Sequence, residues 1–442
     1  MEAFTVKIID MKTAAAQKEL EKISARSKME KKDVNDSVKA ILKAVKEEGD
    51  RALIRFTERF DKVKLEKDAL EVTPREIDAA KEALDPVLYE DLEAAAASVR
   101  RFHEAQLINT KKVELEDDCG SKVALIERPL ERVGIYVPGG TAPLPSSVLM
   151  NAIPAAAAGV EEIIMCTPPG KDGKVADVIL AAAAISGVDR IFRIGGAQAI
   201  AALAYGSESV PAVDMISGPG NIYVNTAKRL VFGQVAIDMF AGPSEILIIA
   251  DETADPLFVA RDMLSQAEHD VLASALLLTD SRELALAVQD ELRRAAACAD
   301  RRSILEASLR DYAAILLCED LKEATELSNR FAPEHLEIMV RSEAEEETLA
   351  AVKNAGAIFL GPWSPEPLGD YYAGPNHTLP TSGTARFFSP LNVSQFRKKI
   401  SLIQYKKESL EKVASRVERL AMSEGLDCHA AAVAVRRERF NE

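Results

Sequence analysis

Histidine is scarce in this sequence, and four of its five histidines stand in segments that can do chemistry. Imidazole is a common zinc ligand and the usual general base near neutral pH. Gln266 and His269 lie three residues apart in LSQAEHD, which puts an amide oxygen and a ring nitrogen on one face of a predicted helix. Such a pair can hold a cation, although a polar helix end with a capping role has the same spacing.

Carboxyl groups accompany two further histidines. Glu334 and His335 follow a helical pattern and precede the strand-like LEIMV, and α/β enzymes commonly place catalytic groups at such junctions. Asp370 and His377 belong to PEPLGDYYAGPNH, a loop rich in glycine, proline and aromatic residues. Together they indicate metal-assisted or acid–base chemistry, while each segment taken alone also fits an ordinary polar loop.

The end of the chain holds the last candidates. Glu424 and His429 occur in SEGLDCHAAA, with Cys428 directly before the histidine. We expect Cys428 to be a small buried side chain rather than a further ligand. His103, in RRFHEAQL, is expected to have only a surface or packing role.

Glycine-bearing turns after three predicted strands indicate a different kind of site. Glycine lets backbone amides approach a phosphate at the start of a helix. None of the turns is G-x-G-x-x-G or a P-loop, so each one alone is more typical of a tight strand-to-helix turn. Their occurrence in one block favours a nucleotide. The turns are Val137-Pro138-Gly139-Gly140, Ile194-Gly195-Gly196 and Ser217-Gly218-Pro219-Gly220-Asn221.

The elements that must position these residues alternate along the chain. The first hundred residues are predicted to be helical, with an N-cap at Thr73, a proline at Pro74 and a capping-box Glu76. After an extended stretch at 113–137, short apolar strands (EEIIMC, RIFRIG, VDMISG, VAIDMF) alternate with alanine-rich helices, and the alternation resumes after Ser244. This pattern predicts two doubly wound, Rossmann-like α/β blocks of successive βαβ units, which a diverged duplication would explain. From about residue 389 onward the sequence, which includes the charged segment FRKKISLIQ, predicts a helical tail that must pack on the rest of the chain or on another subunit.

Bulk properties exclude several classes of function. A net charge of −15 disfavours broad binding to nucleic acid or to an anionic membrane. No apolar run approaches the ~20 residues that span a bilayer, and the first residues do not have the pattern of a secretory signal. Five scattered cysteines without a C-x-x-C predict no disulfide framework, so we expect a cytoplasmic protein.

A set of longer strings is similar to the histidinol dehydrogenase family. The resemblance extends in family order from about residue 15 to residue 437, and it implies oxidation of L-histidinol through L-histidinal to L-histidine, with two NAD⁺ reduced. The strings are ERVGIYVPGG, GGAQAIAA, SGPGNIYV, IDMFAGPSEI, SQAEHD, APEHLE, LGDYYAGPNHTLPTSGTARF and EGLDCHA.

The resemblance also implies roles for single residues. Glu334 and His335 match the catalytic pair: His335 would take the alcohol proton as hydride leaves, and Glu334 would activate the water that hydrates the aldehyde. One Zn²⁺ per subunit would be held by Gln266, His269, Asp370 and His429. Those four residues, with Ser244, His335, His377 and Glu424, would contact the substrate, and Tyr136, Gln198 and Asn221 would bind NAD.

The family further implies a homodimer in which the tail reaches the partner's active site. We expect an N-terminal extension at 1–30, a larger domain with the metal site at 31–135 plus 245–388, an inserted NAD-binding domain at 136–244, and a helical tail at 389–442. Three rival functions remain open. They are a paralogous dehydrogenase of another polar alcohol such as sulfopropanediol, a zinc hydrolase, and a binding protein without activity.

Overall fold

The computed structural model describes residues 5–26, 32–108, 113–139, 143–240 and 242–439. It divides into two compact units, one formed by 1–105 and 130–396 and the other by 106–129 and 397–442. The first unit holds two parallel sheets, and the second holds an antiparallel ribbon and two helices. Within the described ranges, no helix is both long and apolar enough to cross a membrane.

The N-terminal region confirms one local prediction and corrects another. The Thr73 side chain accepts a hydrogen bond from the Glu76 amide, and the Glu76 carboxylate accepts one from the Thr73 amide, so α4 (Pro74–Ala83) begins with the predicted capping box. The all-helical expectation is wrong at β1 (Lys7–Asp10), which pairs in parallel with β11 (Ala313–Leu317). The helices of this region are α1 (Ala14–Ala25), α2 (Lys32–Glu48), α3 (Asp50–Asp61), α4, and α5 (Pro86–Ile108).

The first parallel sheet contains the alternating block predicted before residue 244. Its strand order is β6-β5-β4-β7-β8. Helices α2, α3, α8 and α9 pack on one face through a continuous apolar core, and α6 and α7 connect the strands on the other face. The elements are β4 (Arg132–Tyr136), α6 (Pro145–Ala158), β5 (Glu162–Thr167), α7 (Asp177–Ser186), β6 (Arg190–Arg193), α8 (Gly196–Tyr205), β7 (Met215–Ser217), α9 (Ile222–Val231) and β8 (Ala236–Ile237).

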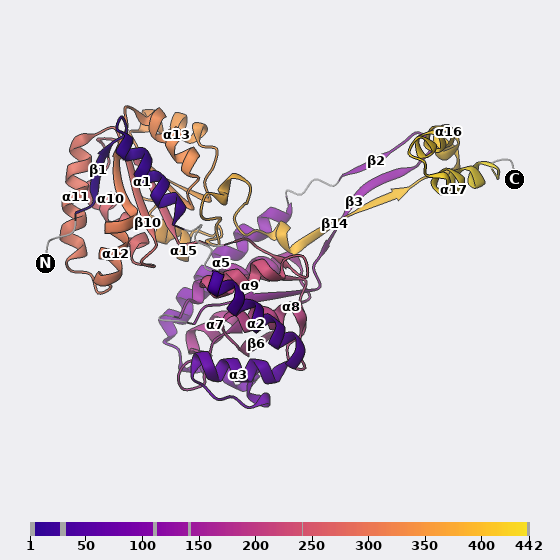
Figure 1. The fold of residues 1–442 in the computed structure, drawn as a ribbon, viewed down its shortest axis with the longest axis horizontal. Coiled ribbons are helices and arrows are strands. Elements are labelled where there is room, and N and C mark those ends of the chain that lie inside the picture. Colours follow the sequence, from indigo (N-terminus) through magenta and orange to yellow (C-terminus); the bar gives the residue numbers. More distant parts are fainter. Residues whose placement is uncertain (1–4, 27–31, 109–112, 140–142, 241, 440–442) are drawn as a thin grey trace. The chain divides into compact units, whose positions relative to one another are not determined.

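The second parallel sheet has the order β1-β11-β10-β9-β12-β13. Helices α10, α11 and α12 cover one face and α1, α13 and α14 the other, and Figure 1 shows α11 and α13 on opposite sides of the strands. The elements are β9 (Glu245–Ala250), α10 (Pro256–Ala267), β10 (Ser274–Thr279), α11 (Arg282–Ala296), α12 (Arg302–Tyr312), β11, α13 (Leu321–Phe331), β12 (His335–Met339), α14 (Ser342–Ala351), β13 (Ala357–Leu360) and α15 (Glu366–Tyr371).

The two sheets share one topology. Strands β4, β5 and β6 of the first sheet correspond to β9, β10 and β11 of the second, and β7 and β8 on the other side of β4 correspond to β12 and β13 on the other side of β9. The second sheet has β1 as an additional edge strand beside β11. The arrangement of the five corresponding strands is doubly wound, and it confirms the predicted fold class. The common order also agrees with the idea of a diverged duplication, which the sequence suggests only weakly.

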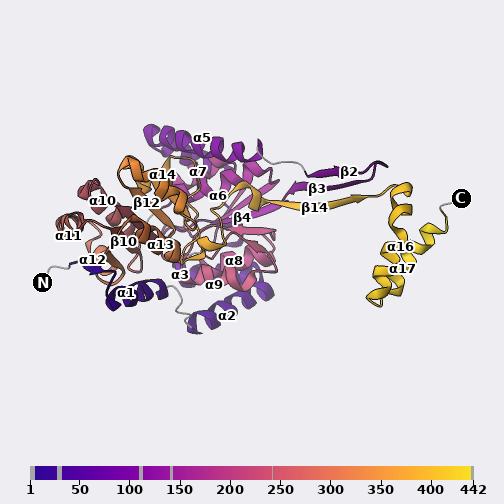
Figure 2. The same ribbon diagram turned by 90° about the horizontal axis from the view of Figure 1, so that it is seen from above.

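The second unit differs from the expected all-helical tail. Residues 397–404, expected to be helical, form strand β14 (Arg397–Gln404), which pairs antiparallel with β3 (Lys122–Pro129) along its whole length. β2 (Glu114–Glu116) extends this ribbon, and α16 (Lys407–Ser423) and α17 (Asp427–Arg437) pack together at its end (Figure 2). Successive residues of KKISLIQ point to opposite faces of the ribbon, as in any β-strand. The charged residues around this segment make its two-residue period hard to recognise in the sequence.

We expect Gly218→Ala to destabilise the protein much more than Gly187→Ala. Both glycines have positive φ, 114° and 81°, which costs a residue with a Cβ about 1–2 kcal/mol. A Cβ on Gly218 would also lie 2.1 Å from the Tyr136 carbonyl oxygen, whereas nothing lies within 4 Å of one on Gly187. Urea unfolding should therefore show a loss of about 3 kcal/mol or more for Gly218→Ala and about 1 kcal/mol for Gly187→Ala. Equal losses would show that the close approach of β4 and β7 does not require a glycine.

Candidate active site and metal centre

The proposed catalytic pair lies at the amino edge of the second sheet. His335 is the first residue of β12 and aligns with Ile246 of β9, and Glu334 directly precedes it. The main-chain amide of Glu245 donates to the Glu334 carboxylate (2.9 Å), and His335 Nδ1 lies 3.0 Å from the Glu245 carbonyl oxygen. A carbonyl can only accept, so Nδ1 carries the proton and Nε2 keeps its lone pair. The peptide groups of one residue therefore orient both side chains.

Burial shifts the pKa values of Glu334 and His335 in opposite directions. Glu334 and His335 are 7% and 4% exposed. Burial lowers the pKa of His335 to about 4, so the imidazole is a neutral base at neutral pH. Burial, with the nearby Glu245 charge, raises the pKa of Glu334 well above its usual range. Desolvation therefore favours the uncharged form of both groups in the metal-free protein.

A buried ion pair holds Glu245 in place. Arg26, at the end of α1, donates from Nη2 to the Glu245 carboxylate (2.8 Å), and both side chains are almost fully buried. The same guanidinium donates to the carbonyl oxygens of Ile23 (2.6 Å) and Leu272 (2.9 Å). Arg26 therefore joins α1 and the loop before β10 to the residue that orients the catalytic pair.

A cluster suited to a metal ion lies beside His335. Ligand atoms of His269, Glu366 and Asp370 all fall within 4.8 Å of one another, and Glu366 Oε1 is 3.6 Å from His335 Nε2. Gln266, on the last turn of α10, is buried and its Oε1 has no hydrogen-bond partner. An amide oxygen, an imidazole and carboxylates form a donor set that fits a divalent cation such as zinc.

Glu366 is the main residue of this cluster that the sequence reasoning missed. It starts the short helix α15 and precedes Asp370 by four residues, so both side chains lie on one helix face. That spacing was the available signal. Two more buried acids lie nearby: the Glu366 amide donates to Glu337 (3.0 Å), and burial raises the pKa of Asp262, which contacts Glu337, to about 6.

The remaining candidates divide between the two units. His377 is half-buried with Nε2 unpartnered, and Ser244 lies directly before β9. Glu424, at the end of α16, and His429, in the first turn of α17, belong to the second unit and are exposed. Cys428 is also exposed, so the expectation of a buried cysteine is wrong for this chain, whereas Ala430, two residues further along α17, is buried.

A cavity of about 1170 Å³ lies at the carboxyl edge of the first sheet. Tyr136 ends β4, Gln198 is in α8 and Asn221 caps α9; all three line this cavity, where the strand order reverses between β4 and β7. Doubly wound sheets bind nucleotides at this point. Gln198 Oε1 is buried without a partner, so its amide is available to a ligand. Gly140, from the first of the glycine turns, lies outside the described residues.

The Tyr136 and Asn221 side chains also form hydrogen bonds within the protein. The Tyr136 hydroxyl accepts a hydrogen bond from the Gly196 amide (3.1 Å), and the Asn221 oxygen accepts from the first amides of α9. The Tyr136 hydrogen and the Asn221 amide group remain as donors. The cavity walls also carry Arg59 and Lys171, together with Asp61 and with Arg55, which is paired with Glu48. These features fit an anionic dinucleotide in size and charge.

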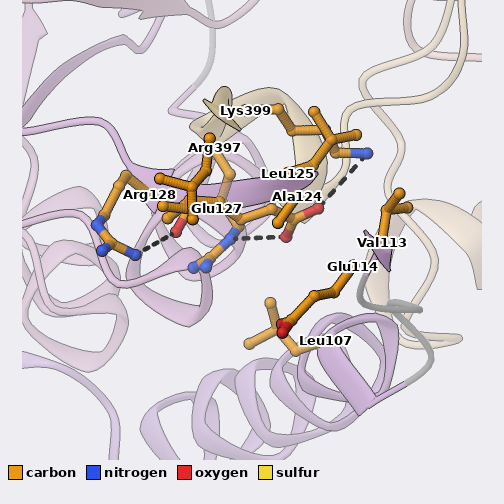
Figure 3. Close-up of a pocket in the computed structure, with 11 residues that line it drawn as sticks. Leu107, Val113, Glu114, Ala124, Leu125, Glu127, Arg128, Arg397 and Lys399 are labelled. Atoms are coloured by element: carbon orange, nitrogen blue, oxygen red, sulfur yellow. Dashed lines mark hydrogen bonds and ion pairs between the residues drawn. The ribbon is translucent and has the colours of Figure 1, made fainter. Parts of the chain in front are cut away.

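A smaller hollow of about 520 Å³ lies within the second unit, beside β3 and β14 (Figure 3). The Glu127 carboxylate lies 3.5 Å from both Arg397 and Lys399. One carboxylate thus faces two cations, Glu114 and Arg128 add one charge of each sign, and the other lining residues are apolar. The hollow has no group that resembles the acid–base pair of the first unit.

The fold and the site define an α/β enzyme with a nucleotide-sized cavity on one sheet and an acid–base and metal-type site on the other. The sequence profile of the histidinol dehydrogenase family matches residues 24–437. Histidinol dehydrogenase of Heliobacterium mobile is 51% identical over 422 residues (94% of this chain, 98% of the relative), and that of Aquifex aeolicus is 52% identical over 420 residues (95% and 96%). The crystal structure of histidinol dehydrogenase from Elizabethkingia anophelis is similar over 100% of both chains, with 35% identity and a TM-score of 0.92. The chain therefore belongs to the histidinol dehydrogenase family.

We expect Arg26→Met to destabilise the metal-free protein by about 3–5 kcal/mol, because it leaves the Glu245 carboxylate buried and unpaired. Adding Glu245→Gln should restore part of that loss by removing the orphaned charge. Arg293→Met, which breaks an exposed pair with Asp290, is the control and should cost less than about 1 kcal/mol. Urea unfolding measures all of these variants. A double variant no more stable than Arg26→Met would show that the charge is not the cause.

Proposed function

We propose that this protein is a zinc-dependent histidinol dehydrogenase that acts at the end of histidine biosynthesis. It would oxidise L-histidinol to L-histidinal and then, with water, to L-histidine. Each oxidation would transfer one hydride to NAD⁺; the first would release one proton and the second two, one of them from ionisation of the new carboxyl group. The observation that carries the proposal is the buried His335, which has a fixed tautomer and a free Nε2 beside the metal-type cluster, in a chain of this family.

The proton transfers would be made by the catalytic pair. His335 Nε2 would accept the alcohol proton as hydride leaves the carbinol carbon, because Nδ1 is already committed to the Glu245 carbonyl. Glu334 would then take a proton from the water that adds to the aldehyde. Its carboxyl is anchored by one main-chain amide, so its second oxygen can face that water.

The metal and substrate would share one set of residues. Zinc, when bound, would supply a positive charge that orients the substrate's nitrogen atoms. Within the first unit, Ser244 and His377 would contact the substrate, and Glu424 from the tail would pair with its ammonium group. The proposed zinc ligands, which would also face the substrate, are Gln266, His269, Asp370 and His429.

NAD would occupy the cavity of the first sheet, with contacts to Tyr136, Gln198 and Asn221. We further propose that residues 136–244 act as the NAD-binding domain, inserted into a larger domain of 31–135 plus 245–388, between an extension at 1–30 and a tail at 389–442. The acidic net charge and the biosynthetic role support a cytoplasmic location, without nucleic acid or membrane as a partner.

We also propose that the protein is a homodimer in which the tail completes the partner's active site. Among the described residues of the second unit, the only buried apolar side chains are those of Ala414 and Ala430. Two alanines cannot stabilise a separate domain, while larger apolar side chains stay exposed. These include Leu115, Ile403, Leu420 and Met422.

Incubation with L-histidinol, NAD⁺ and zinc should yield two NADH for each histidine. NADH is followed by absorbance and histidine by chromatography. Prolonged chelation should abolish the activity and added zinc should restore it, since the donor set contains no thiolate to hold the ion tightly. NADH without histidine would indicate that only the first oxidation, from alcohol to aldehyde, takes place or that the enzyme acts on a different alcohol. Full turnover by metal-stripped protein would refute the zinc requirement.

Mixing two inactive variants tests the shared site. His269→Ala and His429→Ala subunits, refolded together, should recover about one quarter of wild-type activity, because half of the dimers are mixed and one of their two sites is intact. Each variant refolded alone is the control. Verified mixed dimers with no activity would mean that each site is built within a single chain.

A further inference from the structure

A buried lysine and a buried aspartate hold the peptide groups on either side of Gly218, in the turn between β7 and α9. Lys228 lies in α9 and Asp238 directly follows β8, and their side chains, each 1% exposed, form an ion pair. The Asp238 carboxylate accepts a hydrogen bond from the Gly218 amide (2.8 Å), and the Lys228 ammonium donates to the Gly218 carbonyl oxygen (2.9 Å). One buried ion pair therefore binds both the donor and the acceptor of a single residue.

Gly218 is a residue whose conformation must be held from outside. Its φ of 114° and the closeness of the Tyr136 carbonyl oxygen leave no room for a Cβ. Glycine also has the greatest backbone freedom of all residues, and Pro219 after it has no N–H with which to hold the turn. Because the two charged groups fix the peptide groups before and after Gly218, they restrict both of its backbone torsion angles.

The turn leads directly to residues that line the nucleotide-sized cavity. Asn221, three residues after Gly218, caps α9 and lines the cavity, as does Tyr136, whose carbonyl oxygen lies against Gly218. Lys228 and Asp238 are not among the lining residues. Any effect of their contacts with Gly218 on a bound nucleotide would therefore pass through the turn.

We propose that Lys228 and Asp238 are positioning residues of the nucleotide site, which fix the turn from Gly218 to Asn221 in the conformation that receives NAD. The inference rests on the proposed NAD-binding function of this cavity and deepens it. Stability alone does not require an ion pair here, because well-packed apolar side chains of similar volume often stabilise a protein as much. Apolar side chains, however, cannot hold an amide and a carbonyl oxygen in fixed directions.

A double variant that removes both charges tests the proposal. Lys228→Met with Asp238→Asn keeps similar volumes and an acceptor for the Gly218 amide, but it leaves the Gly218 carbonyl oxygen without its donor. NADH binding to the full-length protein, followed by NADH fluorescence, should weaken about tenfold, as expected for the loss of a hydrogen bond from a charged group. The KM for NAD⁺ should rise in the same way, while the KM for L-histidinol should not change.

A second ion pair of the same unit is the matched control. Arg193 is also buried, pairs with Glu76 and donates to the main-chain carbonyl oxygens of Ala69 and Glu71. Arg193→Met with Glu76→Gln should lower the unfolding temperature, because those two carbonyl oxygens lose their donor, but should leave the NADH affinity at the wild-type value. The control therefore separates a loss of stability from a loss of positioning.

A milder variant covers the case in which the double variant does not fold. Asp238→Asn alone keeps Lys228 but weakens its attraction to residue 238. It should raise the KM for NAD⁺ by a smaller factor, again without a change in the KM for L-histidinol.

The outcomes distinguish this inference from the function on which it rests. Wild-type NADH affinity in the folded double variant would refute the positioning role and leave the nucleotide site standing. The same would follow if the control pair lost as much NADH affinity as the double variant, because stability would then explain both. A wild-type protein that binds no NADH would refute both the inference and the proposed nucleotide site.

Discussion

The peptide groups of Glu245 are the constraint on which the candidate active site depends. The first residue of a parallel strand has a free amide at the sheet edge, and a buried amide needs an acceptor. Glu334 supplies that acceptor, and the neighbouring carbonyl orients His335 in return. Because the Arg26 guanidinium anchors the Glu245 side chain from α1, a helix far away in the sequence helps to position the chemistry. One buried ion pair therefore links the stability of the fold to the orientation of the proposed catalytic residues.

Five strands have the same order in the two sheets, but the candidate sites lie at opposite edges of them. In the first sheet, the cavity lies at the carboxyl edge, where the strand order reverses and helices begin. In the second sheet, the acid–base pair and the metal-type cluster lie at the amino edge, where β12 starts and α10 ends. The usual rule for ligands in doubly wound sheets thus holds for one half of the molecule only. The reason is local, since the side chains at the amino edge satisfy strand amides that would otherwise be unpaired.

Burial decides the electrostatics of this site. Glu334, Glu337 and Glu366 are all nearly inaccessible to solvent, and desolvation raises the pKa of each carboxyl group, while it lowers that of His335. A concentration of buried acids without matching cations is unfavourable in the metal-free protein. A bound divalent cation would offset that cost. The acidic cluster is therefore consistent with the proposed metal site.

The sequence by itself determined the doubly wound fold class, because short apolar strands alternating with alanine-rich helices leave few other arrangements. It also singled out His269, Glu334, His335 and Asp370, since scarce histidines beside carboxyl groups are visible without coordinates. Tertiary structure alone decided the rest. The i,i+4 relation of Glu366 to Asp370 matters only because α15 turns both toward His269, and the strand character of 397–404 depends on its partner β3. The local sequence pattern indicates which face of a helix or strand a residue lies on, whereas long-range pairing and burial decide which other residues it contacts there.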